Sequence, residues 1–148
     1  MSLIHSFWDR DTYAIVGARA TGRTLIGMFA SALERAGKTV YLVDSRGGTL
    51  GKRPVSPSLA GLERPVDGAL IVCEPTRALD AVRECLAAGV TRIWLDTRGK
   101  SADAAEAAHA AGAELVEERC PLLTIPHAGF IHGLHRSLLQ AFGRLPRP

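Results

Sequence analysis

The stretch that most constrains the fold is residues 12–24, TYAIVGARATGRT. Its first five residues form a short apolar run rich in β-forming side chains, which is typical of a strand buried on both faces. Gly17 ends this run, and the amphipathic pattern of a helix begins at Thr24 or Leu25. A strand, a glycine-bearing loop and a helix in succession create an anion site, because the first helical turn presents free N–H groups and the positive end of its dipole to the loop. We expect a phosphate, and specifically a diphosphate, to bind here.

The loop offers several groups that suit an anion. Its glycines permit positive φ and close backbone approach, its threonines carry hydroxyl donors, and its arginines carry positive charge. The loop lacks the G-x-G-x-x-G fingerprint of dinucleotide-binding folds and the Gly-Lys-Ser/Thr of a P-loop. From the loop alone, a strand-to-helix turn without a ligand therefore stays open as an alternative. The candidate binding residues of the loop are Gly17, Ala18, Arg19, Thr21, Gly22, Arg23 and Thr24.

The composition favours one soluble globular domain. The 148 residues suffice to bury a sizeable core, and 47% hydrophobic and 22% charged residues are ordinary values. No apolar run approaches the roughly 18 residues that span a bilayer, and the first residues lack the pattern of a secretory signal. Three scattered cysteines, Cys73, Cys85 and Cys120, argue against a disulfide scaffold. We expect a cytoplasmic protein with no membrane partner.

The charge balance favours a small anionic ligand. The formal net charge is +3, from 18 basic and 15 acidic residues, and the arginines are scattered along the chain. A nucleic-acid groove needs a concentrated basic surface. We therefore expect a small polyanion as the ligand and no nucleic-acid partner.

Downstream of the loop, short apolar runs alternate with amphipathic segments that end at glycines. The expected strands are 12–16, 39–43, 66–73, 92–95 and 113–116. The expected helices are 24–36, 77–88, one that starts at Ser101 or Asp103 and ends near 111, and 129–142. This alternation predicts an α/β fold, a Rossmann-like doubly wound sheet of about five parallel strands with helices on both faces. We expect a single domain over residues 1–148, with its core at 11–121. Ligands of such sheets bind beyond the carboxyl ends of the strands.

Residues 45–65 are rich in glycine, proline, serine and basic residues and form a long connection, with a short helical turn expected at 58–62. The connection either covers the ligand or is an exposed crossover. Thr76 is the expected N-cap of the helix that follows the third strand. Packing in the core is the expected role of Trp8, Met28, Phe29, Cys73, Cys85 and Trp94.

Asp44 ends the second strand about 20 residues past the glycine loop, where NAD-binding folds place the acid that binds the ribose diol. In a second interpretation, Asp44, Ser45 and Arg46 form a turn that contacts a ribose, an adenine or a phosphate. Position in the sequence does not separate the two.

Six stretches, taken together and in order, carry a family resemblance. They are A-I-V-G-A followed by a Gly-Arg turn at 22–23, V-x-L-V-D-S-R-G-G-T-L-G-K from residue 40, P-S-L at 57–59, P-V-D-G-A-L-I-V at 65–72, I-W-L-D at 93–96 and E-E-R-C-P at 117–121. The chain resembles the small CoA-binding domain proteins, stand-alone Rossmann-like relatives of the CoA-binding part of the succinyl-CoA synthetase α-subunit. The resemblance covers residues 11–121.

The resemblance implies that CoA binds through its ADP half. The pyrophosphate would lie on the loop that begins at Gly17, and Arg46 would meet the ribose or a phosphate. The segment 72–75 would line the path of the adenine or the pantetheine, which adds three candidate binding residues, Cys73, Glu74 and Pro75.

The chain departs from the family pattern at two places. The family's second strand usually ends V-N-P-K, whereas this one ends V-D-S-R, and Arg19 stands where the family has a small or hydroxyl residue. An aspartate repels a 3′-phosphate unless Arg46 or Lys52 compensates, whereas it suits a free ribose diol. Asp44 therefore keeps NAD as the alternative cofactor.

Two groups of residues invite chemical interpretations. Cys120 follows the fifth strand at the expected ligand edge, where a thiol could accept an acyl group or form a mixed disulfide. The simpler interpretation is a small residue that fits the turn before a proline. His132 and His135 share a helix face near His127, and zinc could use such a set. No C-x-x-C or H-E-x-x-H accompanies them, so we expect surface or interface residues and no metal.

Because the sequence contains no evident nucleophile–base pair, it predicts a non-catalytic module that binds CoA or an acyl-CoA. One alternative is an NAD(H)-binding protein or redox sensor that uses Asp44. Another is an interaction protein whose last helix joins a second copy, as a homodimer, or a partner protein.

Overall fold

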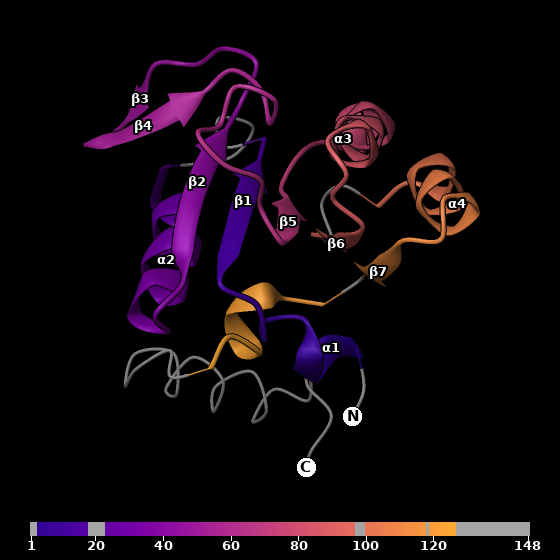
Figure 1. Ribbon diagram of the computed structural model, residues 1–148, viewed down its shortest axis with the longest axis horizontal. Coiled ribbons are helices and arrows are strands. Elements are labelled where there is room, and N and C mark those ends of the chain that lie inside the picture. The colour runs from indigo at the N-terminus through magenta and orange to yellow at the C-terminus, as the bar shows by residue number, and fades with distance from the viewer. Residues whose placement is uncertain (1–2, 18–22, 97–99, 118, 127–148) are drawn as a thin grey trace.

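The computed structural model describes residues 3–17, 23–96, 100–117 and 119–126. Within them, a mostly parallel sheet of seven strands has the order β3-β4-β2-β1-β5-β6-β7 (Figure 1). The strands are β1 (Thr12–Val16), β2 (Thr39–Val43), β3 (Thr49–Leu50), β4 (Arg53–Ser56), β5 (Gly68–Ile71), β6 (Arg92–Leu95) and β7 (Glu114–Glu117). The helices are α1 (Leu3–Ser6), α2 (Arg23–Arg35), α3 (Pro75–Ala87) and α4 (Ala102–Ala110), with a 3-10 turn η2 (Pro121–Leu123).

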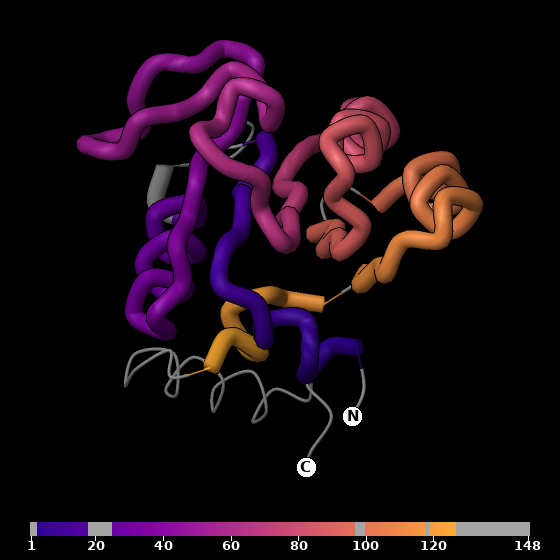
Figure 2. The backbone as a smooth tube through the Cα atoms, viewed as in Figure 1, coloured from indigo at the N-terminus to yellow at the C-terminus, as the bar shows by residue number. Residues whose placement is uncertain are grey.

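The sheet is doubly wound, as the sequence predicts. From β1 the chain passes through α2 to β2 on one side, and it later runs outward on the other side from β5 through α3, β6 and α4 to β7. Right-handed crossovers in opposite directions place their helices on opposite faces. Figures 1 and 2 show α2, α1 and η2 on one side of the sheet and α3 and α4 on the other.

The buried side chains form two cores, one on each face of the sheet, because successive side chains of a strand point to opposite faces. Tyr13 and Ile15 of β1 pack on the α2 side, whereas Ala14 and Val16 pack on the α3 side. All five residues of β1 are buried. Such a fully buried parallel strand explains why the run is apolar throughout rather than alternating.

The five predicted strands are confirmed as β1, β2, β5, β6 and β7, but the sheet is wider than predicted. The connection 45–65 contains a small hairpin in which β3 pairs antiparallel with β4, and β4 runs parallel to β2 with Leu42 opposite Val55. Leu50 and Val55 anchor the hairpin in the α2-side core. The helical turn expected at 58–62 takes the form of two hydrogen-bonded turns, in which Gly61 N–H donates to the Ser58 carbonyl (3.3 Å) and Leu62 N–H donates to the Leu59 carbonyl (3.2 Å).

Two helix starts differ in outcome. The prediction of Thr76 as an N-cap is wrong, since α3 begins at Pro75 with Glu74 as its N-cap. Proline suits the first helical position because it lacks the N–H that would be unpaired there. Of the two starts that the sequence allows for α4, Ser101 and Asp103, the structure has Ser101 as the N-cap, and its hydroxyl accepts a hydrogen bond of 3.2 Å from Ala104 N–H. The expected helix 129–142 lies outside the described residues.

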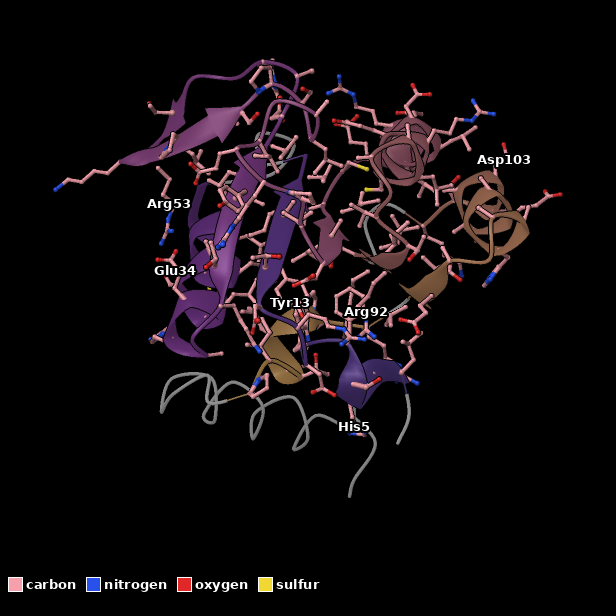
Figure 3. The ribbon with its side chains drawn as sticks, viewed as in Figure 1. His5, Tyr13, Glu34, Arg53, Arg92 and Asp103 are labelled. Carbon is pink, nitrogen blue, oxygen red and sulfur yellow. The ribbon has the colours of Figure 1, made fainter. Side chains whose placement is uncertain are left out.

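An aromatic cluster packs the N-terminal segment against the sheet. The rings of Phe7, Trp8, Tyr13 and Trp94 are all fully buried, and Trp8 stacks on Trp94 with centroids 5.2 Å apart. The packing roles predicted for both tryptophans are confirmed. Figure 3 shows Arg92 beside α1, where its guanidinium donates to the Ser6 carbonyl and pairs with Glu114.

The first prediction concerns Gly68, which faces the ring of Tyr13. A Cβ at Gly68 would lie 2.9 Å from Tyr13 Cε1, so Gly68→Ala overpacks a buried contact. We expect a loss of about 1–3 kcal/mol in the free energy of unfolding, measured by urea denaturation. The matched control is Gly27→Ala in α2, where nothing lies within 4 Å of the added Cβ, and it should leave stability unchanged or raise it. Equal effects of the two substitutions would contradict the packing described here.

The second prediction concerns alkaline pH. Tyr13 Oη donates to the Phe7 carbonyl (2.7 Å) and accepts from Arg10 N–H (2.9 Å), and burial raises the pKa of Tyr13 from 10.0 to about 12. Because the folded state prefers the neutral phenol, this contribution to stability is complete below pH 10 and is lost as the pH rises towards 12. Tyr13→Phe should therefore unfold with a weaker dependence on pH between 10 and 12. An unchanged pH dependence in the variant would rule out this role of the hydroxyl.

Candidate functional site

The strand ends that meet at the centre of the sheet form the candidate site. β1 lies between β2 and β5. From β2 the chain extends the sheet in one direction, and from β5 it extends the sheet in the other, so the carboxyl end of β1 is the topological switch point. Gly17 N–H donates to the Val43 carbonyl (2.8 Å), and Val72 N–H donates to the Val16 carbonyl (2.9 Å). These bonds bring the carboxyl ends of three strands together.

Gly17 occupies a position that accepts no side chain. Its φ is +87°, and a Cβ there would lie 2.3 Å from the Val72 carbonyl oxygen. The chain thus turns out of β1 in direct backbone contact with the end of β5. Glycine is needed at this turn for both its conformation and its size.

A cavity of about 270 Å³ opens beside this turn. Its walls are the ends of β1, β2 and β5 and one face of α3. The residues that line it are Val16, Gly17, Val43, Asp44, Ser45, Cys73, Arg77, Asp80, Ala81 and Glu84. Pockets that enclose a drug-sized ligand are generally larger, about 300–1,000 Å³. The cavity therefore suits one end of an extended ligand.

Asp44, which lines this cavity, forms an ion pair with Arg46. Arg46 Nε lies 3.0 Å from Asp44 Oδ1, and Arg46 Nη2 lies 3.1 Å from Oδ2. The Asp44 side chain is 3% exposed, whereas that of Arg46 is 52% exposed. The hydrogen bond to Asp44 raises the pKa of Arg46, so the guanidinium remains charged. A nearly buried carboxylate is thereby neutralised by a partner that still faces solvent.

The backbone around Asp44 is held from both sides. Asp44 N–H donates to the Ser56 carbonyl of β4 (2.9 Å), and Gly47 N–H donates to the Asp44 carbonyl (2.8 Å) to close a four-residue turn. Arg46 N–H also donates to Asp44 Oδ1 (3.0 Å). The interpretation of 44–46 as a turn is therefore confirmed as local structure.

Cys73 forms part of the cavity wall and is 3% exposed. Burial raises the pKa of its thiol from 9.0 to about 11, and burial likewise raises the pKa of Cys85 to about 12. Both thiols are protonated at neutral pH, so neither is an activated nucleophile. The predicted packing roles of Cys73 and Cys85 agree with this burial.

The structure brings together only part of the predicted site. Gly17, Asp44, Ser45 and Cys73 line one cavity, with Glu74 and Pro75 immediately after Cys73 at the start of α3. Arg23 and Thr24 lie in the first turn of α2. Several predicted residues lie outside the described ranges, namely Ala18, Arg19, Thr21, Gly22, His127, His132 and His135. Among the described residues, no cluster of three or more metal-ligating side chains occurs.

Cys120 follows β7, as the sequence predicts, but it does not join the cavity. It is half-buried against the α2-side core and is not among the residues that line the cavity. After β7 the chain crosses to this face, where Trp94 Nε1 donates to the Arg119 carbonyl (3.0 Å) and Trp8 Nε1 donates to Thr124 Oγ1 (2.9 Å). These two hydrogen bonds hold residues 119–126 against the α2 side of the sheet, where the aromatic cluster lies.

The sequence interpretation missed the contribution of α3. Arg77, Asp80, Ala81 and Glu84 all line the cavity. Their spacing of three, four and seven residues places them on one helix face. That spacing, on a helix that follows the third predicted strand, was the available signal.

The structure is a Rossmann-like fold with a cavity at its switch point. A family model described as a CoA binding domain matches residues 11–126, and the chain belongs to this family. None of the curated proteins matches the sequence. Within the described residues, no helix has the length and apolar character needed to cross a bilayer.

Solved structures share the fold. A hypothetical protein from Pyrococcus horikoshii is 21% identical with a TM-score of 0.72, over 80% of this chain and 84% of that chain. A Thermus thermophilus protein is 26% identical with a TM-score of 0.69, over 82% and 92%. The dinucleotide-forming acetyl-coenzyme A synthetase 1 of Ca. Korarchaeum cryptofilum is 18% identical with a TM-score of 0.60, over 78% of this chain but 27% of that longer chain.

The third prediction concerns the cavity wall. With iodoacetamide at pH 8, Cys73 should react about 100-fold more slowly in the folded protein than in urea, because burial both hides the thiol and raises its pKa from 9.0 to about 11. Peptide mass spectrometry measures the rate at each cysteine, and half-buried Cys120 serves as the internal comparison. A rate at Cys73 equal to that in urea would mean that the wall is open.

Proposed function

We propose that this protein binds CoA or an acyl-CoA through the ADP half of the ligand, at the carboxyl edge of the sheet. The observation that carries the proposal is the cavity at the switch point, bounded by Gly17 and Asp44, in a chain of the CoA-binding domain family. Open α/β sheets bind nucleotides in this crevice.

In this proposal the ligand extends along the edge. The adenosine enters the cavity, whose volume of about 270 Å³ accommodates a nucleobase and not the whole cofactor. The diphosphate lies between Gly17 and the N-terminus of α2, which supplies backbone N–H groups and a positive dipole. The pantetheine arm then leaves the cavity towards solvent.

NAD is the second candidate, favoured by the place of Asp44 at the end of β2. An acid at this position binds the ribose diol in NAD-binding folds. Here both carboxylate oxygens of Asp44 already accept hydrogen bonds from Arg46, so a diol must compete with an ion pair. This competition favours CoA over NAD.

A binding role without covalent chemistry is the simplest form of the proposal. The nucleophile in the cavity wall, Cys73, is held as a thiol by burial. The predicted homodimer, or a partner bound through residues 129–142, is a separate proposal that the mass of the protein in solution tests.

The fourth prediction is thermal stabilisation by CoA. A ligand that binds only the folded state adds about 2.7 kcal/mol at a hundredfold excess over its Kd. Thermal unfolding is followed with CoA, ADP, pantetheine and NAD, each at millimolar concentration. CoA and ADP should raise the Tm, whereas pantetheine, which lacks the ADP half, should not. No shift with CoA or ADP would overturn the proposal, and a shift with NAD alone would establish the second candidate.

A pair of variants locates the binding site. Ala81 lines the cavity from α3, so Ala81→Met should fill the space of the adenosine and weaken CoA binding more than tenfold. Ala87→Met, at an exposed position near the end of the same helix, is the control and should bind CoA as the parent protein does. Methionine is a good helix former, so both variants retain α3. Equal affinities of the two variants would place the ligand elsewhere.

A further inference from the structure

We propose that Asp44 is a positioning residue, which holds the Arg46 guanidinium ready for a phosphate monoester on the ribose of the ligand. The site then selects a phosphorylated adenosine ribose over one that carries free hydroxyls. This inference rests on the proposed function and adds to it the chemical group that decides specificity.

The first support is the inequality of burial within the pair. The Asp44 side chain is 3% exposed and its backbone is tied to β4 through the Ser56 carbonyl, so its carboxylate has a fixed position. The Arg46 side chain is 52% exposed. A long flexible cation is therefore held by a rigid buried anion, which reduces the rotamer freedom that Arg46 would otherwise lose on binding a ligand.

The second support is the edge of the guanidinium that Asp44 uses. The bonds to the carboxylate come from Nε and Nη2, which form one side of the planar group. A guanidinium has five N–H donors in a fixed fork, so its other edge, at Nη1, keeps donors directed away from Asp44. That edge suits a second anion, and a phosphate accepts such a pair of bonds well.

The third support is the place of the pair. Asp44 and Ser45 line the cavity proposed for the adenosine, and Arg46 is the next residue, with an exposed side chain, in the turn closed by Gly47. The ribose of a bound adenosine would lie next to the end of β2. A phosphate on that ribose is then the anion nearest to the free edge of Arg46.

The charges that face Arg46 come from two elements. Asp44 pairs with it directly, and Glu74, the N-cap residue of α3, also raises the pKa of Arg46 by its negative charge. A ligand phosphate would meet the charge of Glu74 as a repulsion. Removal of that carboxylate should therefore favour the phosphorylated ligand selectively.

The same arrangement disfavours an unphosphorylated ribose. A diol would need carboxylate oxygens as acceptors, and both oxygens of Asp44 accept from Arg46. The diol would also have to face a guanidinium, which has donors and no acceptor. Asp44, which suggests an NAD site in the sequence, thus holds the Arg46 guanidinium in the folded protein.

The fifth prediction compares two ligands that differ only in the 3′-phosphate. Isothermal titration of the full chain with CoA and dephospho-CoA should give at least tenfold tighter binding of CoA. Arg46→Gln should reduce CoA affinity to the level of dephospho-CoA without changing the latter. Asp44→Asn keeps the size of the side chain and an oxygen for the turn, and it should lose most of the discrimination although Arg46 is still present.

Two further variants test the geometry. Arg46→Lys keeps the charge but not the fork, and should show an intermediate ratio of the two affinities. Glu74→Gln should increase that ratio severalfold. The ratio is measured within one preparation of each variant, so a partly unfolded sample changes both affinities and leaves the ratio intact.

Each other outcome overturns a stated claim. Equal binding of CoA and dephospho-CoA by the parent protein would refute this inference and leave the proposed function standing, whereas binding of neither would refute the proposed function itself. An equal loss of both ligands in Asp44→Asn would show that the residue only supports the fold.

Discussion

The contact between Gly17 and the Val72 carbonyl is the constraint on which the rest of this site depends. A β-carbon at Gly17 would lie 2.3 Å from that oxygen, so the ends of β1 and β5 approach as closely as two backbones can. Gly17 also lines the cavity, which lies on the α3 side of the sheet. The glycine that begins the sequence motif thus has a left-handed conformation at the switch point, in the cavity wall.

The two faces of the sheet are packed with different kinds of side chains. On the α2 side, four buried aromatic rings and the indole hydrogen bonds to Arg119 and Thr124 fix both flanking segments against the strands. On the α3 side, small residues such as Ala14 and Ala78 leave the core less bulky, and polar side chains of α3 face the cavity. Both faces therefore contribute packing, and the cavity lies on the α3 side.

Sequence reasoning succeeded where the physical signal is local. The bounds of β1, β2 and β6 follow from apolar runs that end at glycine or charged residues, and the carboxyl-edge rule brought Asp44 and Cys73 to one place. It failed where tertiary contacts decide. The strands β3 and β4 are too short to show a period, and the path of Cys120 depends on indole bonds from distant tryptophans. Which edge of Arg46 is free is likewise a property of the folded turn.

The edge of the sheet formed by β3 and β4 affects how copies of this protein can associate in solution. Beyond β2, the sheet ends in a four-residue strand that contains Pro54 and a two-residue strand at the outermost position. The Arg53 guanidinium, paired with Glu34 of α2, places charge beside this margin (Figure 3). A proline lacks the donor that a ladder needs, and so short an edge offers little backbone to a neighbouring chain. The hairpin thus disfavours strand addition at this edge of the parallel sheet.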